Sequence, residues 1–137
     1  MMGSFTRQAG ASLAPCIFVK LASTGYVIAC STGDAMWGIT PYYQRRLSIV
    51  NTSGTQQWAD GYCAILGEGV ACIGPGDDQA LLRLGGTVAA GDYLKSDSSG
   101  YGVTASSDKD HVNAQAIRAG VSGDLVPVKP MRFDLAV

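Results

Sequence analysis

Residues 88–100, with the sequence VAAGDYLKSDSSG, carry the signals that decide the fold. An apolar strand end leads into Gly91, which tolerates the positive φ of a tight turn, and the Asp92 side chain can accept hydrogen bonds from backbone amides there. A short strand follows from Tyr93 to Lys95 and ends in a second turn, Asp97 to Gly100. This stretch therefore predicts a chain of short strands joined by tight turns.

The same alternation of short apolar runs and turn residues continues in both directions. Glycine makes up 18 of the 137 residues, or about 13%, which is nearly twice its usual share of roughly 7%. The predicted strands are residues 16–21, 26–30, 46–50, 62–66, 70–73, 80–84, 93–95, 102–104, 125–128 and 131–137. Turns about every ten residues between strands of this length indicate an all-β sandwich or barrel.

A single segment, Asp110 to Ala119, is predicted to be helical. Asp110 is a good N-cap residue, and Gly120 could be the C-cap that ends the helix. Between them, Val112 and Ala116 precede Ala119 at helical spacing. The predicted fold is therefore mainly β, a single compact β-barrel or sandwich-like domain with one short α-helix.

The first 15 residues differ in character from the rest. They are small residues without periodicity, and Pro15 precedes the first strand. We expect residues 1–15 to form an extended N-terminal arm that a partner orders, and residues 16–137 to form one β-rich domain, since domains of 100 to 150 residues are common. Phe5, Arg7 and Leu13 are the arm residues that could anchor to a neighbour.

The charge content argues against several classes of partner. Charged residues are 15% of the chain, and ten Lys and Arg against eleven Asp and Glu leave a net charge of −1. This balance supplies no field to attract nucleic acid or an anionic membrane, and no apolar run approaches the roughly 18 residues that span a bilayer. So little charge also leaves little repulsion between copies, which favours a permanent oligomer.

The motifs that would carry catalysis or bind a cofactor are missing from the sequence. His111 is the one histidine, and Gly74-Pro75-Gly76 lacks the Lys-Ser/Thr that completes a phosphate-binding loop. Asp77 and Asp78 belong to a turn without the alternating ligands and closing glutamate of a calcium loop. We therefore expect no enzyme activity, no cofactor and no metal site.

The four cysteines also lack a zinc or redox spacing, because 14, 33 and 9 positions separate Cys16, Cys30, Cys63 and Cys72. Each lies among Ile, Val, Ala or Leu, which predicts buried, reduced thiols. A cross-strand disulfide between Cys63 and Cys72 is the alternative.

Residues 36–46, MWGITPYYQRR, concentrate the residue types that dominate protein interfaces. The candidate interface residues in this segment are Trp37, Tyr42, Tyr43, Arg45 and Arg46. The arginine pair beside tyrosines favours an interface loop, although Trp37 and Trp58 could equally be core anchors of a small β-domain.

Two family resemblances follow from these motifs. Residues 88–94 resemble the turn of lipoyl and biotinyl domains, which implies a carrier whose modified lysine would be Lys109. In that family the lysine lies at a hairpin tip soon after the Gly-Asp turn, whereas Lys109 comes much later. A monomeric β-barrel ligand-binding or carrier module is thus the alternative function.

The second resemblance extends over most of residues 16–130. The order of pieces is similar to that of the small cement or decoration proteins of tailed bacteriophage capsids. The pieces are FVKL at 18–21, Gly33-Asp34, Gly38-Ile39, residues 88–100, AQAIRAG at 114–120 and GDLVPV at 123–128. The arm and residues 51–79 have no counterpart in this pattern.

The resemblance implies a structural virion protein made in the host cytoplasm. Such a protein is a β-rich domain that sits as a trimer on the outer capsid surface, bridges neighbouring copies of the major capsid protein and stabilises the shell. The expected partners are therefore the major capsid protein and further copies of this chain. Three joined copies would bind strongly even where each single site is weak.

Overall fold

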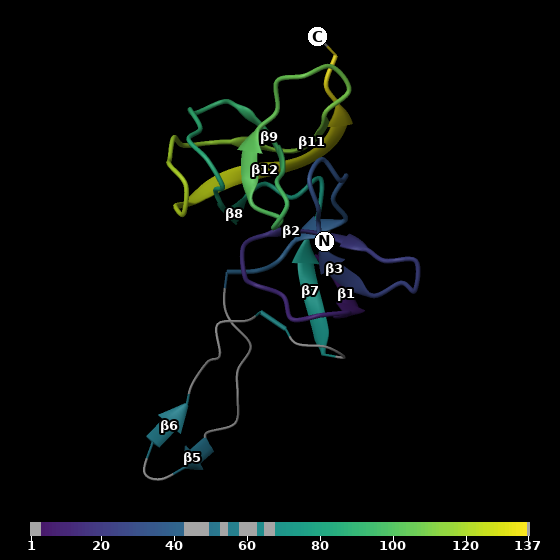
Figure 1. Ribbon diagram of the computed structural model, residues 1–137, viewed down its shortest axis with the longest axis vertical. Coiled ribbons are helices and arrows are strands. Elements are labelled where there is room, and N and C mark those ends of the chain that lie inside the picture. Colours follow the sequence, from purple (N-terminus) through teal and green to yellow (C-terminus); the bar gives the residue numbers. More distant parts are fainter. Residues whose placement is uncertain (1–3, 43–49, 53–54, 58–62, 65–67, 137) are drawn as a thin grey trace.

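The computed structural model describes residues 4–42, 50–52, 55–57, 63–64 and 68–136. These residues form two five-stranded sheets and a two-stranded hairpin that Figure 1 draws apart from both sheets. The strands are β1 (Ser4–Gln8), β2 (Phe18–Leu21), β3 (Val27–Ala29), β4 (Gly38–Ile39), β5 (Val50–Thr52), β6 (Thr55–Gln57), β7 (Gly69–Ile73), β8 (Ala80–Arg83), β9 (Tyr93–Ser96), β10 (Gly102–Thr104), β11 (His111–Ala116) and β12 (Leu125–Asp134).

The first sheet has the order β1-β7-β4-β2-β3, and neighbouring strands are antiparallel. Its two edges approach each other, because Ala9, just after β1, forms a parallel bridge with Val27 of β3. The Gly10 amide donates to the Val27 carbonyl over 2.8 Å. The first sheet is therefore curled.

The second sheet has the order β10-β9-β11-β12-β8 and curls in the same way. Leu84, just after β8, bridges Gly102 of β10, and the Gly85 amide donates to the Gly102 carbonyl over 2.8 Å. A Cβ atom added to Gly102 would lie 2.5 Å from Leu82 Cδ2, so the close packing inside this curl requires a glycine.

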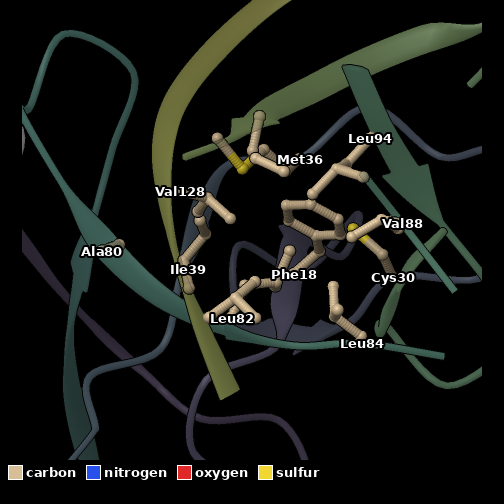
Figure 2. Close-up of a cluster of buried hydrophobic side chains, with 13 residues drawn as sticks. Phe18, Cys30, Met36, Ile39, Ala80, Leu82, Leu84, Val88, Leu94 and Val128 are labelled. Carbon is tan, nitrogen blue, oxygen red and sulfur yellow. The ribbon is translucent and has the colours of Figure 1, made fainter. Parts of the chain in front are cut away.

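One hydrophobic core joins the two sheets (Figure 2). Phe18 of β2 is fully buried, and its ring lies among side chains of the second sheet that include Leu82, Leu84 and Leu94. The Phe18 amide donates to the carbonyl of Gly100, which lies in the turn after β9, over 2.8 Å. The two sheets are thus held together by both apolar packing and backbone hydrogen bonds.

The opposite face of the first sheet has a core of its own. Val19, Val27 and Val70 pack there with residues from the segments that precede β2 and β7, among them Leu13 and Ala64. Because successive side chains of a strand point to opposite faces, Phe18 and its neighbour Val19 belong to different cores.

A buried asparagine of β11 forms a polar link between the second sheet and the loop before β4. The Asn113 Nδ2 donates to the Asp34 carbonyl over 3.0 Å, and its Oδ1 accepts from the Met36 amide over 3.1 Å. Asn113 is fully buried, so these two bonds satisfy a side chain that would otherwise be costly to bury.

Five turns of the described chain share one construction, which we call the Gly-Asp turn. The amide of the first residue donates to the aspartate Oδ2, and the aspartate amide donates back to the first residue's carbonyl. The residue before the aspartate has a positive φ in each turn. The turns are Ser31–Asp34, Gly74–Asp77, Ala89–Asp92, Ser107–Asp110 and Val121–Asp124; the positive-φ residue is glycine in all except the fourth, where it is Lys109.

The predicted helix is wrong, and no α-helix occurs among the residues that the structure describes. Residues 111–116 instead form β11, where Val112, Ala114 and Ala116 are buried at every second position. The spacing of Val112, Ala116 and Ala119 is compatible with a helix, but apolar residues at every second position from Val112 to Ala116 are equally compatible with a strand. Pairing with β9 and β12 makes this segment a strand. The mainly β class is confirmed. Nor does the described part of the chain contain a helix able to cross a membrane.

The N-terminal residues are part of the fold, in contrast to the expected arm. Ser4–Gln8 forms β1 and pairs with β7 in antiparallel register, and Ala9 and Leu13 are fully buried. The partner strand lies more than 60 positions away, so no local turn motif indicated this pairing. Two other predicted strands, residues 46–50 and 62–66, lie largely outside the described residues.

β12 is one long strand where two were predicted, residues 125–128 and 131–137. Pro130 lies between the two predicted strands, and proline cannot donate a ladder hydrogen bond. The structure accommodates it at an irregularity: the register with β11 shifts between Val112, which faces Phe133, and Ala114, which faces Pro130.

Candidate functional site

The candidate interface residues of the loop after β4 are only partly within the described chain. Tyr42 is 62% exposed and is the most exposed large hydrophobic residue there. Trp37 is half-buried and packs against the core that contains Val19, so the core-anchor interpretation describes it in this structure. Tyr43, Arg45, Arg46 and Trp58 lie outside the described residues.

The three anchor residues of the arm fall into two groups. Phe5 and Arg7 lie in β1, which is the edge strand of the first sheet; their side chains are outside the described part. Leu13 is a core residue, whose amide donates to the Ala64 carbonyl over 2.8 Å. An edge strand presents unpaired backbone groups to which another strand could add.

The four cysteines are buried free thiols, as the sequence predicted. Burial raises the pKa of Cys16 and Cys63 to about 11 and the pKa of Cys30 and Cys72 to about 12. Because the thiolate is the reactive form, protonated buried thiols are poor nucleophiles at neutral pH.

His111 and Lys109 are the two residues with a conceivable chemical role, and the structure places each of them in a structural setting. The His111 Nδ1 lies 2.6 Å from the Asp134 Oδ1 at the exposed end of β12. Lys109 occupies the positive-φ position of a Gly-Asp turn, between β10 and β11, which both pair with β9 and not with each other. The hairpin tip that a carrier lysine requires is therefore not formed at Lys109.

The described residues offer no group of three metal-ligating side chains. What they offer is contact surface, and two exposed regions stand out.

The first region is the outer face of the second sheet, which we call the aromatic face (Tyr93, Gln115, Lys129 and Phe133). Gln115 faces Tyr93 on one side and Lys129 on the other, whereas their neighbours Leu94, Ala114 and Val128 fill the core. The rings of Tyr93 and Phe133 meet edge to face, with centroids 5.2 Å apart and an interplanar angle of 87°. The two side chains remain 37% and 39% exposed. This face was not predicted from the sequence, because it depends on which strands are neighbours.

The second region is one end of the second sheet, which we call the apolar tip (Ala89, Ala90, Ile117, Ala119 and Val121). The loops after β8 and after β11 meet here through a two-bond bridge, in which Val88 and Gly120 exchange amide-to-carbonyl bonds of 2.9 and 3.1 Å. Each loop contains a Gly-Asp turn. Ile117 is 50% exposed and Val121 is 54% exposed, and the three alanines are exposed as well.

The fold places the chain among all-β proteins built from two curled sheets. No protein-family model and no curated protein matches it. Among solved structures, the chain is similar to the head fiber gp8.5 N base of bacteriophage phi29, with a TM-score of 0.64 and 16% sequence identity. The alignment covers 100% of both chains. The likeness thus concerns the whole fold, which the two chains share at low sequence identity.

Proposed function

We propose that the chain is a structural protein of a bacteriophage virion that binds the outer surface of the major capsid protein shell as an oligomer and stabilises it. The observation that carries this proposal is the end-to-end fold likeness to the base of a phage head fiber. Because the alignment covers 100% of both chains, the likeness extends over the entire fold and not over one motif of it. The motif order of capsid decoration proteins in residues 16–130 points to the same class by a separate route.

The surface chemistry suits a protein that acts by contact. The aromatic face supplies Tyr93 and Phe133, and aromatic residues dominate the energetics of protein interfaces. We propose that this face contacts the shell, together with the exposed Tyr42. Lys129 lies on this face, and the contacting pair His111 and Asp134 lies next to Phe133 in the sheet; these polar groups would form a rim.

A homotrimer would make such contacts effective. When three joined copies bind one lattice, the second and third contacts are intramolecular, so affinity rises without any new contact. The low net charge favours the same arrangement, because copies of this chain repel one another little. The proposed location is the outer capsid surface, after synthesis in the host cytoplasm.

The test is co-sedimentation of the purified chain with DNA-free capsids of its own virus that were assembled without it. We expect saturable binding at a fixed ratio to the major capsid protein and a higher thermal midpoint of the decorated shells. The double variant Tyr93→Ala/Phe133→Ala should weaken binding at least tenfold, while Gln79→Ala, at an exposed position elsewhere, should not. Absence of binding at micromolar concentration would refute the function; unchanged binding of the double variant would refute the assignment of the face.

A further inference from the structure

We propose that Cys16 and Cys63 are a redox pair that forms a disulfide within the chain when the surroundings change from reducing to oxidising. The bond would join the segment that enters β2 to the segment that precedes β7. This inference goes beyond the proposed function and does not depend on it, because it concerns a reaction between two groups of one chain.

The backbone brings the two cysteines to one place in the first sheet. Leu13 and Ala64 form an antiparallel bridge, and the Leu13 amide donates to the Ala64 carbonyl over 2.8 Å. The Cys63 amide donates in turn to the Leu13 carbonyl over 2.6 Å. Cys16 follows Leu13 by only three residues, so the segment that carries Cys16 begins in direct contact with the backbone of Cys63.

The two thiols are also electrostatic neighbours. Burial is the largest cause of the raised pKa of Cys63, about 11, and the charge of the Cys16 thiolate is the next. Both side chains are buried, so this interaction takes place inside the protein. Cys30 belongs instead to the core around Phe18, and the charges that act on its thiol are those of Asp34 and Lys20.

Cys72 is the competing partner for Cys63. After burial, the charge of the Cys63 thiolate also raises the pKa of Cys72, and both residues line the core that contains Val19. Cys72 pairs with Phe5, however, whereas Cys63 contacts Leu13. Since Leu13 is eight residues from Phe5 and three from Cys16, the register favours Cys16 as the partner.

The backbone of Cys16 has a conformation that favours glycine. Its φ is 61°, and six of the eight residues with a positive φ in the described chain are glycines. The Cys16 amide donates to the Thr40 carbonyl over 3.2 Å, and its carbonyl accepts the Arg83 amide over 2.8 Å. Strained residues that their surroundings hold in place are common at functional sites. A disulfide gives this position a reason to be cysteine and not glycine.

The exposure of the thiols sets the order of the reaction. Cys63 is 7% exposed, whereas the other three cysteines are at most 1% exposed. With a small-molecule disulfide as the oxidant, the Cys63 thiolate attacks one sulfur atom of the oxidant, forms a mixed disulfide and releases one thiol. The Cys16 thiolate then attacks the Cys63 sulfur and releases the second thiol. The two cysteines lose two protons and two electrons, and the oxidant is reduced to two thiols.

The reaction should be slow at neutral pH. Burial raises the pKa of both thiols to about 11, and the Arg83 guanidinium opposes this rise only in part at Cys16. Because the thiolate is the nucleophile, the rate should increase about tenfold for each pH unit below these values. The pair would therefore stay reduced in a cytoplasm and would close over longer times outside it.

The disulfide would close the loop from residue 17 to residue 62, which includes β2 to β6. A cross-link across so long a loop restricts the unfolded chain and thereby stabilises the fold. Cys16 also bonds to the backbone of Arg83 in β8 of the second sheet. The cross-link would thus tie the segment before β7 to a place where the two sheets meet.

The experiment incubates the purified chain with oxidised glutathione at about pH 8.5, where more thiolate is present, and then digests it without reduction. We expect the mass of the single chain to fall by two hydrogens and a peptide pair that contains Cys16 and Cys63. The thermal midpoint of the oxidised chain should exceed that of the reduced chain by at least about 5 °C.

Variants separate this pair from the other thiols. Cys16→Ala and Cys63→Ala should each abolish the cross-link and the gain in thermal midpoint, whereas the matched control Cys30→Ala should keep both. Circular dichroism shows whether each variant is folded, and peptide mapping of the wild-type chain identifies the pair even if a variant is not. A Cys63–Cys72 peptide, cross-links only between chains, or four free thiols after prolonged oxidation would overturn the proposal.

Discussion

The two sheets are built from contacts of different range. In the second sheet, β9 pairs with β10 and β11 pairs with β12, so strands close in sequence form hairpins. In the first sheet, β1 pairs with β7, which joins Ser4–Gln8 to Gly69–Ile73. Three of the five Gly-Asp turns lie between residues 89 and 124, at the ends of second-sheet strands. Two of the four strand pairings in the second sheet are thus hairpins, against one, β2 with β3, in the first sheet, so local turn chemistry specifies more of the second sheet than of the first.

The largest effect is expected where the two sheets depend on each other. Phe18→Ala should destabilise the protein by about 3–5 kcal/mol, since it removes a fully buried ring from the shared core. Guanidinium chloride unfolding measures this loss, and Tyr26→Ala at an exposed position should cost under about 0.5 kcal/mol. We expect a single transition. Hydrogen exchange that remained slow in β9–β12 while β2–β4 exchanged freely would show that the second sheet is stable alone.

The buried polar link should be the next most sensitive point. Asn113→Ala leaves the Met36 amide and the Asp34 carbonyl without this partner inside the protein, which costs about 1–3 kcal/mol. Gln115→Ala is the control in the same strand, because its surface bond to the Gly91 carbonyl is exposed to water. Urea unfolding compares the two. Equal, small losses would show that water replaces Asn113 and that the link between the sheets is dispensable.

Acid should destabilise one Gly-Asp turn in each sheet, and the group that contributes most to lowering the aspartate pKa differs between the two turns. The Lys20 side chain, and then the Ser31 amide, lower the pKa of Asp34; the Ser107 amide comes first among the groups that lower the pKa of Asp110. Because both pKa values are lowered on folding, the carboxylates contribute stability fully above about pH 4, and this stability is lost as the pH falls through the lowered values.

The two turns can be separated by removing one lysine at a time. Lys20→Met should flatten the acid dependence of Tm more than Lys95→Met does, since the lysine is the largest cause of the lowered pKa at Asp34, whereas the Ser107 amide is the largest at Asp110. We expect differences of a few degrees at most, because both pairs are partly solvated. Thermal scans at neutral and acidic pH measure this; a larger effect of Lys95→Met would reverse the assignment.

The range of contacts also explains what the sequence could and could not predict. The strands flanked by glycine-rich turns were predicted within a residue or two, among them β9 and β10. β1 was missed because its only cue was β7, and β11 was mistaken for a helix because its small residues suit both periods. Likewise, the edge-to-face pair of Tyr93 and Phe133 and the bridge of Val88 with Gly120 arise from strand neighbours that no local motif specifies.

The smallest expected effect is a gain in stability, at the one Gly-Asp turn that lacks its glycine. Lys109 has a φ of 67°, whereas the sister turns have glycine at this position with φ between 77° and 97°. A left-handed conformation costs a non-glycine residue about 1–2 kcal/mol, which glycine avoids. Glycine also increases the entropy of the unfolded chain, which offsets about 0.5–1 kcal/mol of this gain in stability. Lys109→Gly should therefore stabilise the protein by about 0.5–1 kcal/mol, and Gly91→Ala, where an added Cβ meets no neighbour, should destabilise it by about 1 kcal/mol. Urea unfolding of both variants measures the pair. Changes of opposite sign in the free energy of unfolding would show that the two turns act as equivalent local units, as the construction of the second sheet implies. A loss of stability in Lys109→Gly would show instead that the lysine side chain makes a contact that stabilises the protein by more than its backbone strain costs.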